Sequence, residues 1–414
     1  MKKISGKARV IISDSIWSII AIAVMNMVAQ FAVYPFLAAR FGEETYGDIL
    51  YLLSYINIIA VSGGSALNYA RITSSASGKT ENGEYNLILL ILCGIALPFS
   101  FAVRSFGGTD MPGGEVWLFW GLLCMTMFRN YIDVDFRLDL NYKGYFWYYM
   151  AVSLGYLLGI VLCKFTGRWE LALLPGEVFG VLFVLVRGGN LNRRFAVLSP
   201  RVKDTVTTAM IMLGTNFLLN LIFNADRLML KMLISGSAVT IYYLATLLGK
   251  TVSLITTPLN SVIISYLAKY EGGFTKAMFR KVLLIIFGAI VVLVLGCVAA
   301  SYVLIGILYP ESFEATKPFF FISSLSQVIF FATTVLTVVL LRFAKQRYQL
   351  YINLIYALAF AVLGIPMTKS GGIWGFSYAI LIANVVRLGA SVGFGLLDQR
   401  RRSAKTETVQ TEIE

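Results

Sequence analysis

Apolar stretches of about 20 residues recur along the whole chain, and polar residues gather in the short segments between them. A helix of about 20 residues, rising about 1.5 Å per residue, crosses the roughly 30 Å hydrocarbon core of a bilayer. Only 14% of the 414 residues are charged, whereas soluble domains carry about 25%. The chain has too few charges to cover a water-facing surface. The sequence therefore predicts an all-α polytopic membrane protein surrounded by lipid.

The apolar pattern predicts about twelve transmembrane helices joined by short connections. Their approximate ranges are 13–38, 46–66, 86–106, 116–135, 145–164, 170–187, 206–232, 238–267, 281–308, 317–342, 348–367 and 373–396. No connection is long enough to form a separate soluble domain. The segment after Leu397 is polar, so we expect residues 398–414 to form a cytoplasmic tail without regular structure.

The distribution of basic residues predicts the orientation of the chain. About 25 of the 35 Lys and Arg residues fall on the side that holds both termini, and about 7 fall on the other side. Because cytoplasmic connections carry an excess of Lys and Arg, both termini are predicted to be cytoplasmic. The same rule accounts for the excess of basic residues behind the net charge of +13. The basic residues form no continuous face, so we expect membrane lipids and not nucleic acid as partners.

An internal repeat is visible when the sequence is shifted by 196 residues, which aligns the first three spans with spans seven to nine. Arg40-Phe41-Gly42…Tyr46 then falls on Gly236…Tyr242, each at a turn between two helices. We expect two six-helix lobes, 1–195 and 196–397, related by an axis along the membrane normal, with a substrate site between them near the midplane. The alternative is a chance alignment of hydrophobic helices.

Two basic residues inside spans are candidates for substrate binding, because an ionisable group at membrane depth costs about 2.5–3.5 kcal/mol on insertion scales. Lys250 lies about twelve residues into span eight, too deep to reach either interface. It could bind an anionic substrate or pair with a carboxylate for packing. Arg387 lies about eight residues from the cytoplasmic end of span twelve, within partial reach of that interface.

Span seven carries Asn216, Asn220 and Asn224 at intervals of four residues. This spacing places the three amides on one helix face, and a polar stripe of this kind should not face lipid. Either a water-filled cavity, in which the amides would contact substrate, or an interhelical hydrogen-bond seam would satisfy it.

Asp226 and Glu177 are the candidates for binding a coupling ion. Asp226 precedes Arg227 near the outer end of span seven, where an interfacial ion pair is the plain alternative. Glu177 follows Pro175-Gly176 in span six, a step that we expect to kink the helix and to leave the carboxylate beside free backbone groups.

Arg129, near the inner end of span four, is a further candidate for substrate binding. It stands four residues before Asp133, so the pair could instead be a surface salt bridge. The chain has no His, which removes His metal ligands and general bases, and its four Cys lie in apolar runs without metal-like spacing. We expect no metal, no cofactor and no catalytic residue.

Several segments resemble polysaccharide flippases, the O-antigen (Wzx-like) branch of the multidrug/oligosaccharidyl-lipid/polysaccharide exporter superfamily. They are Tyr34-Pro35…Arg40-Phe41-Gly42, Tyr46-Gly47, Asn224-Ala225-Asp226-Arg227, Val239…Tyr242-Tyr243-Leu244-Ala245, Pro258 and Gly371-Gly372…Gly375…Ala379. The resemblance covers nearly the whole chain, but its motifs are loose. Lipid II flippases of the same superfamily have fourteen helices, and the predicted twelve depart from that number.

The resemblance implies transport of an undecaprenyl-pyrophosphate-linked oligosaccharide between the leaflets of a bacterial plasma membrane. The oligosaccharide would be a repeat unit of O-antigen in lipopolysaccharide, of capsule or of exopolysaccharide, and polysaccharide polymerase and chain-length proteins would be partners. A multidrug exporter of the same superfamily is the alternative, although its organic cations need an acidic cavity. A polysaccharide polymerase or ligase is less consistent, because those enzymes use a large outer loop with catalytic Arg or His.

Overall fold

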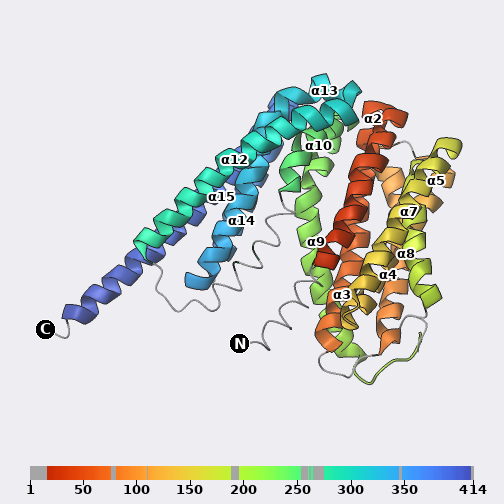
Figure 1. Ribbon diagram of the computed structural model, residues 1–414, viewed down its shortest axis with the longest axis horizontal. Coiled ribbons are helices and arrows are strands. Elements are labelled where there is room, and N and C mark those ends of the chain that lie inside the picture. Colours follow the sequence, from red (N-terminus) through yellow and green to blue (C-terminus); the bar gives the residue numbers. More distant parts are fainter. Residues whose placement is uncertain are drawn as a thin grey trace. The chain divides into compact units, whose positions relative to one another are not determined.

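The computed structural model describes residues 16–75, 81–109, 111–187, 195–252, 260, 263, 275–344 and 347–411. Every regular element in these residues is a helix (Figure 1), which confirms the predicted all-α class. The chain forms two compact units, Met1–Leu228 and Met229–Glu414. The first unit includes most of the seventh predicted span, whereas the repeat places a boundary at residue 195. The two six-helix lobes remain a prediction.

The first unit begins with helical residues 16–28. Its further elements are η1 (Ala29–Val33), α2 (Tyr34–Tyr55), η2 (Ile56–Val61), α3 (Ser62–Ser75), α4 (Asn82–Phe106), α5 (Gly113–Ile132), α6 (Val134–Leu138), α7 (Tyr142–Thr166), η3 (Trp169–Ala172), α8 (Leu174–Arg187) and most of α9 (Val202–Leu233). The elements η1 and η2 are π-helical turns. Gly42 (φ 76°) breaks α2 at the turn that the repeat predicted, because glycine adopts positive φ without steric cost.

The second unit contains α10 (Gly236–Thr251), α12 (Lys276–Leu308), α13 (Pro310–Thr316), η5 (Lys317–Phe319), α14 (Phe320–Phe343) and α15 (Arg347–Thr411). Gly372 (φ 56°) separates the two predicted spans that α15 contains. The helix continues to Thr411. The expectation of a tail without regular structure is therefore wrong for residues 398–411. The continuation fits a segment that holds no Pro or Gly between residues 398 and 411.

Each predicted span overlaps a helix in the described residues. Among the residues that the structure describes, seven helical stretches are long and apolar enough to cross a membrane. The stretches Ile16–Ser74 and Arg347–Gln399 each hold two predicted spans. The sixth span starts at Leu174 and not at residue 170. Span eight can be followed continuously only to Val252, and Pro258 lies outside the described residues.

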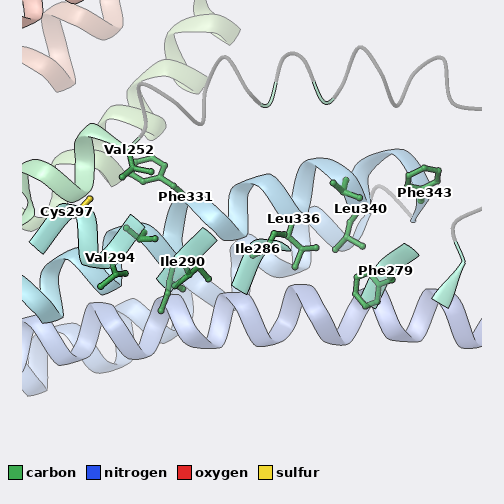
Figure 2. Close-up of a cluster of buried hydrophobic side chains, with 13 residues drawn as sticks. Val252, Phe279, Ile286, Ile290, Val294, Cys297, Phe331, Leu336, Leu340 and Phe343 are labelled. Carbon is green, nitrogen blue, oxygen red and sulfur yellow. The ribbon is translucent and has the colours of Figure 1, made fainter. Parts of the chain in front are cut away.

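The core of the second unit is a row of buried side chains between α12 and α14 (Figure 2). Ile286, Ile290 and Val294 contribute from α12, spaced by four residues, and Leu336 and Leu340 contribute from α14. Lipid is as apolar as these side chains, so their association depends on close packing and not on exclusion of water.

The first unit uses a small residue to bring two helices together. A Cβ atom at Gly64 of α3 would lie 2.7 Å from Asn130 Cβ and closer still to the Met127 carbonyl oxygen, both in α5. Only glycine permits this approach, as is common where membrane helices cross.

Candidate functional site

The three asparagines of α9 lie on one face of the helix, and all three have partners in the first unit. Asn220 Nδ2 donates to Ser62 Oγ at 2.9 Å, and Ser62 Oγ donates to the Asn216 carbonyl at 3.1 Å. Asn57 Nδ2 donates to Asn224 Oδ1 at 3.4 Å. Of the two alternatives left by the sequence, the described conformation therefore contains the interhelical hydrogen-bond seam.

This amide seam, defined as Asn57, Ser62, Asn216, Asn220 and Asn224, includes two residues that the sequence analysis did not single out. Asn57 lies in the π-helical turn η2, and Ser62 follows it directly. Such turns are rare and are found often at functional sites. The available signal was an amide in the middle of the apolar span 46–66.

Arg129 and Glu177 form a buried ion pair between α5 and α8. Arg129 Nε donates to Glu177 Oε2, and the two residues are 7% and 3% exposed. Tyr156 donates its hydroxyl to Glu177 Oε1 at 2.7 Å, and Tyr148 donates to the Arg129 carbonyl at 2.8 Å. Both charges are thus compensated within the protein. The proposed surface pairing of Arg129 with Asp133 is wrong, because both residues are buried and Asp133 has other partners.

Pro175 is the second residue of α8 and does not kink it. A proline is tolerated in the first turn, where its missing N–H has no helical partner to lose. The expected kink beside Glu177 is therefore absent, and the carboxylate is satisfied by Arg129 and Tyr156.

A second buried polar network joins α3, α5, α6 and α7. Asp133 accepts from Tyr149 at 2.9 Å and from Arg137 at 3.3 Å. Arg71 pairs with Asp135 at 3.2 Å. No local sequence pattern reveals the whole network, because its members come from separate helices. Its compensated charges indicate a role in holding the unit together.

Arg387 belongs to the second half of α15, and its side chain contacts α14 and the first half of α15. Its guanidinium stands 4.5 Å from the centroid of the Phe330 ring and 5.6 Å from that of Tyr356. Its Nη1 donates to the Phe330 carbonyl at 3.2 Å and to Thr334 Oγ1 at 3.4 Å. We call Phe330, Thr334 and Tyr356 the arginine cage.

The cage stabilises the cation without neutralising it. A cation–π contact contributes about 0.5–2 kcal/mol, so two rings offset much of the roughly 2.5–3.5 kcal/mol that an arginine costs at membrane depth. Arg387 is only 7% exposed. No described carboxylate lies within ion-pair distance of it. The second unit therefore holds a buried positive charge that an anionic ligand could compensate.

The two remaining candidate residues lie in different units. Lys250 is half-buried in the last turn of α10. The preceding residue, Gly249, packs against Gln327 of α14, since a Cβ atom added to Gly249 would lie 2.7 Å from the Gln327 Cβ. Asp226 is buried in α9, and its Oδ1 accepts from the Arg227 backbone N–H at 2.9 Å. No cluster of three or more His, Cys, Asp or Glu residues in the described part of the chain could hold a metal ion.

No protein-family model and no curated protein sequence matches the chain. Solved structures do match. The lipid II flippase MurJ in an inward closed conformation is 15% identical, with a TM-score of 0.67 over 92% of this chain and 87% of that chain. An inward-facing multidrug resistance MATE family transporter of the MOP superfamily is 14% identical, with a TM-score of 0.63 over 94% of this chain and 99% of that one.

A third structure, the Vibrio cholerae MATE transporter VcmN in the bent form, is 12% identical and has a TM-score of 0.59 over 97% of this chain and 99% of that one. At these identities the matches establish the fold and leave the cargo open. The chain therefore has the all-helical fold of the MurJ and MATE transporter structures and is a multi-pass membrane protein of that architecture.

Proposed function

We propose that the chain is a flippase that moves an anionic lipid-linked oligosaccharide across the bacterial plasma membrane by alternating access, with both termini in the cytoplasm. The observation that carries this proposal is Arg387, a buried cation held by aromatic rings and a carbonyl without a described carboxylate partner. A pyrophosphate group supplies the negative charge that this environment lacks.

The physics of the cargo agrees with this assignment. A sugar head group cannot cross hydrocarbon unaided, because each unsatisfied polar group there costs several kcal/mol, whereas the lipid tail can remain in the bilayer. An interior-negative potential favours outward movement of an anion by about 2.3 kcal/mol per charge per 100 mV. The fold, shared with the MurJ structure, is compatible with such a cargo.

In this proposal Lys250 and Arg387 bind the pyrophosphate, and the amides at positions 216, 220 and 224 bind sugar hydroxyl groups. The asparagine side chains already make hydrogen bonds that a hydroxyl could replace. Arg129 could contact substrate only after leaving Glu177, and Glu177 or Asp226 would carry the coupling ion. Polymerase and chain-length proteins are the proposed partners downstream.

Export of organic cations is the alternative, because MATE structures share the fold equally. A cation needs an available carboxylate. Three buried carboxylates of the first unit, Glu177, Asp133 and Asp135, each pair with an arginine. Because these carboxylates already neutralise arginines, they are less suited to binding an organic cation, and this favours an anionic cargo.

Arg387→Ala provides the test in cells. In a bacterial strain that lacks its own O-antigen flippase, the native chain should restore surface polysaccharide and R387A should fail at equal membrane levels. R280A is the matched control, because Arg280 is exposed on α12. The same chains in a drug-sensitised host should leave susceptibility unchanged. Drug resistance without polysaccharide export would replace this proposal with the multidrug alternative.

A further inference from the structure

A carboxyl group is enclosed in the short connection between α7 and α8. Glu170 lies in the turn η3 and has no exposed surface. Within the described part of the chain, no other residue donates a hydrogen bond to either of its carboxylate oxygens. It differs in this from Glu177, whose oxygens are both satisfied.

The neighbouring helices hold η3 in this position. At Gly159 of α7, a Cβ atom would lie 2.7 Å from the Leu171 carbonyl oxygen and closer to that of Ala172. The ring of Trp169 packs on Phe119 of α5, with centroids 6.4 Å apart. These contacts hold the turn between α5 and α7. The Glu170 side chain is buried because the backbone of η3 packs against both helices.

The charges around Glu170 do not compensate it. Glu115 of α5 is a like charge that acts on it, and Arg168 is a cation that acts in the opposite direction. A Cβ at Gly114 would lie 3.5 Å from the Arg168 guanidinium nitrogens, so this guanidinium lies against α5, and it forms no ion pair with Glu170. The Cys163 thiol of α7 is the other titratable neighbour. An isolated carboxylate in such surroundings costs far more than its protonated form.

We propose that Glu170 is a proton-binding site, occupied while η3 is held between α5 and α7 and vacated when the turn leaves this position. Gly167 and Arg168, immediately before the turn, are exposed, so a proton has a short path to solvent. Burial raises the pKa of the Glu170 carboxyl to about 8, and the Glu115 charge adds to this. Its own backbone N–H and Arg168 act in the opposite direction.

A transport cycle that moves η3 would take up and release one proton at this residue. That coupling rests on the proposed transport function. The proton site itself does not, and it can be tested without any cargo.

The first test uses the native full-length chain in lipid nanodiscs and a hydrophobic carbodiimide, which reacts with protonated carboxyl groups in apolar surroundings. Mass spectrometry should find the adduct on Glu170, with a yield that falls about tenfold from pH 7 to pH 9, as a pKa of about 8 requires. Glu311, exposed on α13, should remain unlabelled at both values. No label on Glu170, or equal labelling at both pH values, would overturn the proposal.

The second test compares the native chain with Glu170→Gln, which replaces the protonated carboxyl by a neutral amide. The folded chain binds this proton more tightly than the unfolded chain does. The melting temperature of the native chain relative to E170Q should therefore fall as pH rises from about 4.5 to about 8, and then stay level. A difference that is constant with pH contradicts the proposal. If E170Q does not fold, the labelling of the native chain decides.

Discussion

Buried charges in this protein are stabilised in two chemically different ways. Arg129 and Glu177 compensate one another directly, and Tyr156 satisfies the remaining carboxylate oxygen. Arg387 relies on ring faces and a backbone carbonyl. Compensated charges contribute to structure, whereas Arg387, which has no described carboxylate partner, is the residue that we propose binds an anionic ligand. From the sequence, Arg129, Glu177 and Arg387 all appear as charged residues within spans; the structure distinguishes the ion pair from the arginine without a described carboxylate partner.

Glu177→Gln tests the structural role of the ion pair. The change leaves the buried Arg129 charge without a partner, and breaking such a pair costs about 3–5 kcal/mol. Unfolding of the purified chain in detergent, followed by its far-ultraviolet circular dichroism, should show this loss. The double variant R129M/E177M should recover most of it, because two apolar side chains replace both charges. An E177Q chain as stable as the native one would contradict the assigned role.

The amide seam shows what sequence periodicity can and cannot predict at the residue scale. Spacing by four placed Asn216, Asn220 and Asn224 correctly on one face of α9. Their partners, Asn57 and Ser62, are more than 150 positions away along the chain. No local pattern encodes such a pairing. The i, i+4 rule likewise paired Arg129 with Asp133, although tertiary packing brings Glu177 to Arg129 instead.

At the scale of elements, the apolar pattern predicted the helices well because length and hydropathy determine which segments can cross a bilayer. Breaks at Gly42 and near Gly372 also follow from the sequence. The π-helical turns η1 and η2 and the start of α8 at Leu174, which places Pro175 in the first turn, do not follow from the sequence. These features depend on the helices packed beside them, which single-segment hydropathy does not contain.

Gly64→Ala tests the close crossing of α3 and α5. The added methyl group would overlap the Met127 carbonyl oxygen and Asn130, so the helices must separate and the melting temperature should drop by several degrees. Gly94→Ala in α4 is the matched control, because nothing lies within 4 Å of its Cβ position. G94A should match or slightly exceed the native chain, since alanine favours a helix. Equal losses in both variants would show that the crossing is not tightly packed.

At the scale of the whole molecule, composition and the apolar pattern were sufficient to predict an all-helical polytopic membrane protein, and the matches to the MurJ and MATE structures support the fold. Cargo is different. In the proposed function it depends on a few buried charged side chains, and which of these charges are compensated can be seen only in the folded structure. The orientation of the termini and the internal repeat remain predictions from the basic residues and the alignment.

The most direct measurement compares the affinities of the purified chain for two lipids that differ in one group. One is an oligosaccharide linked to polyprenol through pyrophosphate, and the other is the same oligosaccharide on an uncharged link. The native chain should prefer the pyrophosphate by about 10- to 100-fold, since hydrogen bonds to charged groups contribute about 1.5–3 kcal/mol. K250A and R387A should lose most of this preference and R280A should keep it. Equal affinity of the native chain for both lipids, or a preference unchanged in R387A, would contradict the proposed role of the buried cation.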